Sequence, residues 1–538
     1  MGALTLKSFP FELRGWDIEK FESIDPTDGF GSSTRVYISK QQIVQIEPDY
    51  NETTTNAWLS DKGRQFFDSI FGYLKNSKRH KSSEIYSWNY ILESLFKTLY
   101  FFDHCNNKQQ NNYFFTIVFE NISIEILSLL TIISQNYSFV KIRRSEKIKL
   151  NNDLESNFQL NIPSTNNTAL EKSTLCLLIA NNPRYEGYLL NLGLRQRFIK
   201  GNFKCFVLGS MIDLTFPVNF LGTKLNIIKS INEGNNLFCQ DLKSASNPTL
   251  IFNTDIFKRT DGNNTFEMVK FLNYSNLLNR IWNSNVLNSS IYETGLQSIT
   301  NFPHIKLKDL LQFSSFYFLN LTINNVSNFK KITETKLLNF NKEKYLKINR
   351  LFIDQTSFSE SDNSVFYAKK YISNNKNFNK YLYLPVKMIY ENDENFINTE
   401  GLIRHMSKLI STKKTKDSWK LLRNFFKQSK KNLVFINSKE NSTIFYNLKK
   451  KSNFKNFITF HYNATHTIDS NSFLALTNNQ PLYINKHIFK NKRLKLMDTK
   501  IKYWLDDFYI GGKDGYSQNS LILTNCSNIN RSQNTNFF

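Results

Sequence analysis

A period-two alternation of apolar and polar residues marks positions 33–50, STRVYISKQQIVQIEPDY. The polar break Lys40–Gln42 divides this stretch into two halves, which predicts a β-hairpin. We expect its apolar face to be made by Val36, Ile38, Ile43, Val44 and Ile46. The preceding segment at 25–33, DPTDGFGSS, is rich in turn-forming residues. Residues 1–72 are therefore predicted to form a small β-rich module.

The clearest α/β unit lies at 175–222. The run LCLLIA predicts a buried strand, YLLNLGLRQRFI an amphipathic helix, and KCFVLGS the next strand. Apolar strands joined by a helix indicate a parallel sheet covered on both faces. Ligands usually bind at the turn after such a strand, which makes Asn181, Asn182, Arg184 and Glu186 candidate site residues. Alternatively, the Asn-Asn-Pro sequence only ends the strand and begins the helix.

Elsewhere the pattern predicts further helices and strands. The most apolar stretch, IEILSLLTIIS at 124–134, is too short to cross a membrane and predicts a buried helix, so no transmembrane segment is expected. Helical spacing also marks 82–102 and 417–428, the second with Asp417 as a candidate N-cap. The remaining expectations are strands at 313–321, 365–372 and 380–390, a turn and an apolar segment at 396–410, and an extended polar tail from 517 to 538.

These elements predict an α/β protein of several layered domains. The expected boundaries are a β-rich module at 1–72, an α/β domain with a parallel sheet at 73–330, a second α/β domain at 331–500, and a C-terminal segment with a polar tail at 501–538.

The composition is strongly basic, with 69 Lys and Arg against 45 Asp and Glu and a net charge of +24. A basic surface is typical of proteins that bind nucleic acid or anionic partners. Lys, Asn, Phe, Ile and Tyr are abundant, however, while Gly (18) and Pro (10) are few, as expected of an A/T-rich and often organellar genome. The charge therefore only partly reflects function, and a basic organellar RNA-binding protein stays open as an alternative.

Motifs for catalysis are sparse. The sequence has no Walker A, GxGxxG, HExxH or GxSxG motif, and its five cysteines are far apart with no CxxC pair. A disulfide framework or a metal site built by this chain alone is therefore not expected. The best-placed carboxylates, Glu186 and Glu400, have no evident acid or base partner in the sequence. We expect no catalytic residue and no metal ligand, and therefore a structural protein rather than a catalyst.

Several motifs occur in one order along the chain: GALTLKSFPFELRGWDIEKFESIDPTDGFGSSTRV, WLSDKGRQFFD, LIANNPRYEGYLLNLGLRQ with FVLGSMIDLT, YLPVKMIYENDENFINTEG with DSWKLLRNF, and DDFYIGG. This series resembles the large iron–sulfur subunit of respiratory complex I, the NADH–quinone oxidoreductase. The C-terminal part of that family is similar to the molybdopterin-dependent oxidoreductases. The resemblance implies molybdopterin-oxidoreductase-like α/β layers behind the small β-rich module.

In that family GALT follows a Cys-Pro-Val whose cysteine ligates a tetranuclear iron–sulfur cluster, and this chain starts at the next residue. The resemblance therefore implies the C-terminal half of a split subunit, which binds no cofactor itself. Clusters would lie in a partner chain, the N-terminal iron–sulfur half, near Gly2, Ala3, Leu4 and Thr5, and the β-rich module at 1–72 would dock on that half. The other partners would be hydrophilic-arm subunits and not nucleic acid. The expected location is the matrix side of the mitochondrial inner membrane, with mitochondrial encoding.

Two turns match positions near the cofactor in the molybdopterin enzymes. They are NNPR, with Asn181, Asn182 and Arg184, and NTEG, with Asn398, Glu400 and Gly401. The sequence departs from those enzymes, since Leu402 replaces the usual Arg and no Cys or Ser lies in a molybdenum-ligand context. We therefore interpret the six residues as a vestigial cofactor pocket. The alternative is a free-standing molybdopterin-dependent oxidoreductase, which would bind pterin and metal.

Overall fold

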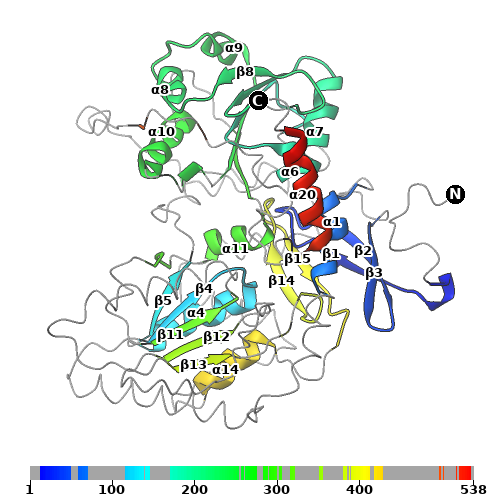
Figure 1. Ribbon diagram of the computed structural model, residues 1–538. Helices are drawn as coiled ribbons and strands as arrows, with labels where there is room; N and C mark the ends of the chain where they lie inside the picture. The colour runs from blue at the N-terminus through cyan, green and yellow to red at the C-terminus, as the bar shows by residue number, and fades with distance from the viewer. Residues whose placement is uncertain are drawn as a thin grey trace, which may run out of the picture. The chain divides into compact units, whose positions relative to one another are not determined.

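The structure is a computed structural model, drawn in Figure 1. It describes residues 13–49, 58–70, 115–137, 140–145, 170–211, 213–253, 256–257, 259, 261–274, 283–288, 290–299, 302–305, 315–320, 351–355, 380–383, 387, 389–411, 417–427, 496–497, 501, 517 and 520–534. The helix expected at 82–102 and the strand expected at 365–372 lie outside these residues, as do Gly2, Ala3, Leu4 and Thr5.

The N-terminal module is an antiparallel sheet in the order β1 (Glu19–Ile24), β2 (Ser33–Ser39), β3 (Gln42–Pro48), preceded by the short helix η1 (Gly15–Asp17) and followed by α1 (Asp61–Gln65). The predicted hairpin is confirmed. Its two-residue turn, Lys40 and Gln41, has positive φ angles of 49° and 64°, which suit the right-handed twist of a hairpin. One detail was wrong: Val44 is only half-buried, because the β2–β3 pairing shifts register there and leaves it without a cross-strand partner.

The predicted α/β unit is confirmed as part of a five-stranded parallel sheet in the order β10-β9-β6-β7-β8. The strand β6 is third in this order, so its carboxyl end lies in the middle of the sheet edge, and it is buried along its whole length. The strands of this sheet and the helices between them are, in chain order, β6 (Leu175–Ile179), α6 (Pro183–Glu186), α7 (Tyr188–Ile199), β7 (Lys204–Leu208), β8 (Asn219–Gly222), α8 (Asn226–Asn232), α9 (Phe238–Ser244), β9 (Pro248–Asn253), α10 (Gly262–Tyr274) and β10 (Asn283–Leu287).

A second five-stranded parallel sheet has the order β13-β12-β11-β4-β5. Its strands are β4 (Phe115–Phe119), β5 (Val140–Arg144), β11 (Ser315–Leu319), β12 (Leu351–Gln355) and β13 (Lys380–Tyr383). The boundary expected at residue 330 therefore falls inside one sheet. Strands that neighbour each other in space need not be neighbours in sequence, and here the whole first sheet is inserted between β5 and β11.

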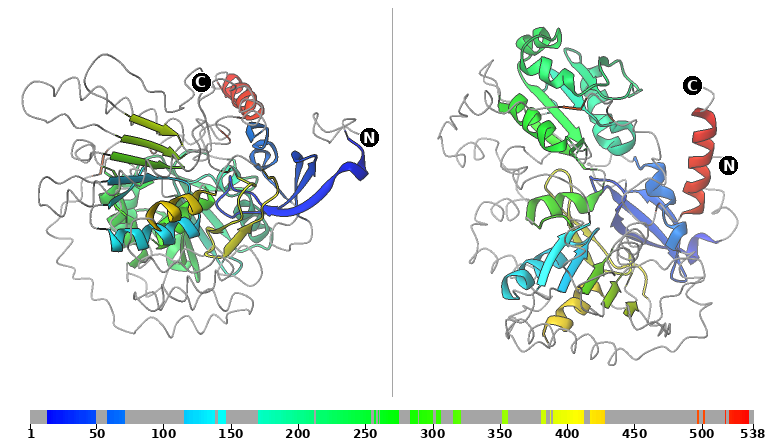
Figure 2. Two further views of the ribbon diagram at one scale, coloured as in Figure 1. Left: turned by 90° about the horizontal axis from the view of Figure 1, so that it is seen from below. Right: turned by 60° about the vertical axis from the view of Figure 1, so that its left-hand side comes forward.

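The helices around the second sheet agree largely with the sequence. The apolar stretch at 124–134 lies within α4 (Ile124–Asn136), and the stretch at 417–428 contains α14 (Ser418–Lys427). These two helices lie side by side (Figure 2). Asp417 precedes α14, and its carboxylate forms ion pairs with Lys387 and Lys420. The helix α11 (Ile291–Ile299) contacts α4.

The hairpin of β14 (Glu394–Ile397) and β15 (Ile403–Met406) shares a hydrophobic core with the N-terminal module. Its members from the two regions include Val36, Ile46, Tyr390 and Phe396, all at most 1% exposed. The Tyr390 hydroxyl donates to the Ile24 carbonyl at 3.1 Å. The core therefore ties the start of the chain to residues more than three hundred positions later.

The extended tail expected from 517 onward was wrong, because residues Leu521–Asn534 form the helix α20. Its first turn is capped from two sides. The Asp68 carboxylate accepts the Ile522 N–H at 3.0 Å, and Ser520 Oγ accepts the Leu523 N–H at 3.1 Å. Leu523 is fully buried in the core shared by the module and the hairpin, so a single apolar anchor and its caps support an otherwise polar helix.

Candidate functional site: two asparagine-bearing turns

The first predicted turn follows the central strand β6. Asn182 Oδ1 accepts the Arg184 N–H at 3.2 Å, which makes Asn182 the N-cap of α6. Glu186 returns to this turn: its Oε2 accepts the Asn182 N–H at 2.9 Å, and its Oε1 accepts the Asn253 side-chain amide at 2.5 Å. The Glu186 carboxylate thus joins the carboxyl ends of β6 and β9, and both of its oxygens are engaged within the chain.

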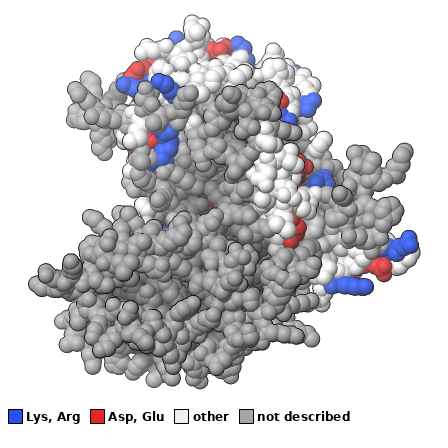
Figure 3. All heavy atoms as spheres, in the orientation of Figure 1, with Lys and Arg blue, Asp and Glu red and all other residues white. Residues whose placement is uncertain are grey.

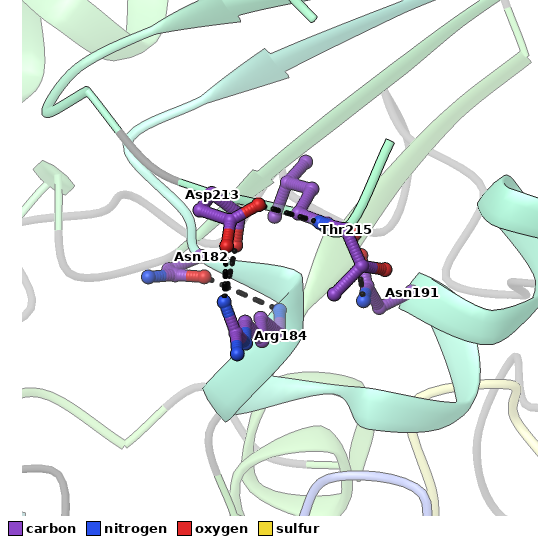
Figure 4. A network of polar contacts seen from close by, with 6 residues as sticks. Asn182, Arg184, Asn191, Asp213 and Thr215 are labelled. Carbon is purple, nitrogen blue, oxygen red and sulfur yellow. Dashed lines mark hydrogen bonds and ion pairs between the residues drawn. The ribbon is translucent and has the colours of Figure 1, made fainter. Parts of the chain in front are cut away.

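Arg184 points from α6 to the loop that follows β7 (Figure 4). Its Nη1 lies 2.7 Å from Asp213 Oδ2 and donates to the Asp213 carbonyl at 3.2 Å. A hydrogen bond from the Thr215 N–H, followed by the Arg184 charge, lowers the pKa of the Asp213 carboxyl. In the same network Asn191 donates to the Leu214 carbonyl at 3.2 Å. The Arg184 guanidinium therefore links α6 to the loop after β7, although its ion pair with Asp213 is exposed to solvent.

Asn181 differs from its neighbours in this turn. Its side chain is only 5% exposed. Neither Oδ1 nor Nδ2 has a hydrogen-bond partner among the residues that the structure describes. A buried amide without partners costs free energy, so this position at the carboxyl end of β6 retains unused hydrogen-bonding capacity.

The second predicted turn, 398–402, joins β14 to β15. Asn398 Oδ1 accepts the N–H groups of Glu400 and Leu402 at 3.0 and 2.8 Å. Asn398 Nδ2 donates to the Phe30 carbonyl at 3.0 Å and to Glu400 Oε2 at 3.1 Å. Gly401 has a φ of +83°, a left-handed conformation that glycine adopts without strain. Both polar atoms of Asn398 therefore serve the fold.

The loop between β1 and β2, residues 25–32, brings the two turns together. The Gly29 carbonyl accepts both the N–H and the Oγ1–H of Thr399 at 2.7 Å. A Cβ at Gly29 would lie 2.0 Å from the Asn288 carbonyl oxygen, so only glycine permits this approach. The Phe30 side chain packs in the core of the first parallel sheet, next to Gly187. Phe30 thus contacts the second turn through its carbonyl and the helices after the first turn through its ring.

The sequence reasoning missed the importance of Gly29 and Phe30. It identified their segment, DPTDGFGSS, only as turn chemistry between strands. A signal was present, because a large aromatic residue between two glycines is unusual in a solvated turn. Phe30 is in fact 2% exposed.

Two buried carboxylates, Asp25 and Asp28, organise the same loop. Asp28 accepts the Gly31 N–H and the Ser32 hydroxyl, both at 2.6 Å, and Asp25 accepts the Thr27 hydroxyl at 2.7 Å. Burial, with a smaller contribution from the nearby Asp28, raises the pKa of Asp25 to about 7. Burial likewise raises the pKa of Asp28. These groups hold loop geometry, and the sequence did not single them out.

The side chains of the two turns do not fit a pterin-bound metal site. Asn398, Glu186 and Arg184 are engaged by the chain's own groups, whereas both buried side-chain polar atoms of Asn181 lack a partner among the described residues. Within the described ranges, no group of three or more His, Cys, Asp or Glu side chains could hold a metal ion. In the same part of the chain, no helix is both long and apolar enough to cross a membrane.

Comparisons with known proteins identify the family of the chain. Residues 87–428 match the family model of molybdopterin oxidoreductases, and residues 18–68 match the model of the NADH-ubiquinone oxidoreductase NDSU1/NuoG-like 4Fe-4S domain. The NADH-ubiquinone oxidoreductase 75 kDa subunit of Reclinomonas americana is 29% identical over 314 residues, which is 55% of this chain and 44% of that protein. The 78 kDa mitochondrial subunit of Neurospora crassa is 29% identical over 310 residues, which is 55% of this chain and 40% of that protein.

Among solved structures, acetylene hydratase from Pelobacter acetylenicus has a TM-score of 0.41 at 9% identity, covering 76% of this chain and 68% of that one. The family-model match, which covers more than half of the residues, shows that the chain belongs to the molybdopterin oxidoreductase family. Within it, the chain groups with the large iron–sulfur subunits of NADH-ubiquinone oxidoreductase, complex I. It spans less than half the length of the curated relatives it matches.

The match to a 4Fe-4S domain contrasts with the expectation that this chain binds no cluster. The matched stretch, 18–68, contains no cysteine, and the first cysteine of the chain is Cys105. Iron–sulfur clusters are held by cysteine thiolates. The matched stretch therefore supplies the module's scaffold without thiolate ligands of its own.

Proposed function

We propose that the chain is the structural C-terminal portion of a split large iron–sulfur subunit of mitochondrial complex I. It would support electron transfer from NADH to ubiquinone through clusters held by a partner chain. The observation that carries this proposal is the 4Fe-4S domain match over a stretch without cysteine. Because clusters are held by cysteine thiolates, the clusters of this subunit would be bound by another polypeptide segment.

The proposal assigns specific places to the predicted residues. Gly2, Ala3, Leu4 and Thr5 would lie beside the partner's cluster, where small residues allow backbone N–H groups to approach and tune it. The six residues of the two turns would form a vestigial pocket that binds no cofactor. The partners would be the cluster-bearing half and other hydrophilic-arm subunits, on the matrix side of the inner membrane, with this chain encoded in the mitochondrion.

Native purification from gently solubilised mitochondrial membranes tests this function. We expect the chain to migrate with NADH dehydrogenase activity and with a separate cysteine-bearing polypeptide, identified by mass spectrometry. Migration alone with molybdenum and pterin would instead indicate a free-standing molybdopterin-dependent oxidoreductase.

Recovery with RNA, lost at high salt, would indicate an organellar RNA-binding protein. The described surface does not favour that outcome. On the face drawn in Figure 3, the Lys and Arg side chains of the described residues are interspersed with Asp and Glu rather than gathered in one basic stripe.

A further inference from the structure

Two large aromatic side chains are exposed at the beginning of the N-terminal module. Trp16, in η1, is 83% exposed, and Phe21, in β1, is 37% exposed. Four successive residues of β1, from Glu19 to Glu22, are exposed, whereas β2 is largely buried. Tryptophan in particular is rarely left in water without a reason, because its large apolar surface gains most from burial.

The exposed aromatic of β1 belongs to the core face of its sheet. Phe21 pairs with Val36 of β2, which in turn pairs with Ile46 of β3. Side chains of directly paired residues point to the same face. Val36 and Ile46 are fully buried, so the apolar face continues outward to Phe21 and there meets solvent. An apolar face that ends uncovered at a sheet edge is typical of an interaction surface.

The opposite face of the same sheet is polar and internally satisfied. The Tyr37 hydroxyl donates to Glu47 at 2.7 Å, and Arg35 pairs with Asp49 at 2.8 Å. The Lys20 ammonium lies 5.5 Å from the centre of the Tyr37 ring. A partner attracted by apolar burial would therefore choose the Phe21 side of the sheet.

We infer that Trp16 and Phe21 are the anchors on which the cluster-bearing polypeptide docks; this rests on the proposed function. The 4Fe-4S domain match begins at residue 18, between these two aromatics, and the matched stretch has no cysteine. Under the proposed function the cluster-bearing polypeptide joins this module at its N-terminal side, where the match begins and the two aromatics lie. The occupant is a chain with cysteine-bound iron, and the anchors fit interface hot spots, which are enriched in tryptophan and cluster in desolvated pockets.

The test compares tagged full-length chains purified natively from the same membranes. The variants are Trp16→Ala, the double variant Trp16→Ala/Phe21→Ala, and Trp58→Ala as a matched control. Trp58 is also exposed, at 58%, but precedes α1 and belongs to neither η1 nor β1. The readout is the ratio of iron-bearing, cysteine-containing polypeptide to tagged chain, by mass spectrometry and iron analysis.

We expect about a tenfold or greater loss of the iron-bearing polypeptide for the double variant, a smaller loss for Trp16→Ala, and no change for Trp58→Ala. Thermal unfolding followed by circular dichroism should be unchanged for Trp16→Ala, because the side chain is exposed. Full retention by Trp16→Ala and by the double variant, while the unsubstituted chain captures the polypeptide, would overturn the docking surface and leave the proposed function intact. Failure of the unsubstituted chain to capture it would overturn both.

Discussion

Both predicted turns carry buried asparagine, but they differ in how its side-chain polar atoms are used. In the 398–402 turn, Asn398 spends its oxygen and its amide on four contacts within the chain. In the turn after β6, Asn181 is also buried, at 5% exposed, yet neither of its side-chain polar atoms has a partner among the described residues. The polar atoms of Asn398 are therefore used to hold the fold, whereas those of Asn181 make no hydrogen bond in the described structure.

Of these two asparagines, Asn398 has a structural role and Asn181 has none in the described structure. Asn398 fixes the approach of the 25–32 loop through the Phe30 carbonyl, and the fold depends on it. No hydrogen bond in the described structure accounts for the Asn181 side chain, as the proposed vestigial pocket would require. The predictions below test this difference, beginning with the largest effect.

Asn398→Ala should destabilise the protein by about 3–4 kcal/mol, because it leaves the buried Phe30 carbonyl and two turn N–H groups without partners. Urea unfolding of the purified chain, followed by circular dichroism, measures this. Asn398→Asp keeps the acceptor but loses the donor and places a buried negative charge beside the Glu400 carboxylate and the Phe30 carbonyl, so we expect a loss at least as large. A cost below about 1 kcal/mol for Asn398→Ala would show that the turn is not held by these contacts.

The β14–β15 hairpin that carries the 398–402 turn should also weaken at alkaline pH. Burial, with repulsion from Glu125 next, raises the pKa of Glu394, the first residue of β14, to about 8. A carboxyl whose pKa is higher in the folded state binds its proton more tightly there. Its stabilising contribution is full below the unfolded pKa near 4.5 and is lost as the pH rises toward 8.

Glu394→Gln should therefore flatten the pH dependence and raise the free energy of unfolding above pH 8 by about 2–4 kcal/mol. Denaturant unfolding at several pH values between 5 and 9 checks this, with Glu22→Gln on the exposed part of β1 as a control. Parallel profiles for Glu394→Gln and the unsubstituted chain would contradict the assignment.

Asn181→Ala should change the stability by less than about 1 kcal/mol, because no hydrogen bond of the described structure is lost and a buried polar group is removed. The same unfolding experiment, run beside Asn398→Ala, gives the most direct contrast between the turns. Equal destabilisation by the two substitutions would eliminate the distinction between them.

Arg184→Ala should have the smallest effect, within about 0.5 kcal/mol, since its ion pair with Asp213 is exposed and such pairs contribute little. The free energy of unfolding of Arg184→Ala should also not change with added salt. A marked loss of stability in the variant, matched by a similar loss when salt is added to the unsubstituted chain, would show that the pair is structurally important.

Local sequence patterns predicted the elements that local physics determines. The strand, turn and helix from Leu175 to Ile199 follow from continuous apolar residues and the Asn-Asn-Pro break, and they form as expected. The contact of Asn398 with Phe30 joins residues 368 positions apart, and no period in the sequence indicates it. For the same reason the pairing of β4 with β11 was not foreseen.

The C-terminal helix shows a different limit. Polar residues dominate Leu521–Asn534, so its periodicity is weak and an extended tail was expected. Its stability comes from Leu523 in a distant core and from the Asp68 carboxylate at its first turn. Helices held by tertiary contacts in this way are difficult to identify from propensity alone.

The central claim is that this chain contributes scaffold and not cofactor. Its most direct test is the iron, molybdenum and pterin content of the full-length chain, purified and separated from its partners, by elemental analysis and pterin fluorescence. The account predicts less than about 0.1 equivalent of each per chain, because residues 18–68 contain no cysteine and the polar atoms of Asn398 and Glu186 are engaged within the chain. Stoichiometric iron, or stoichiometric molybdenum with pterin, would contradict it.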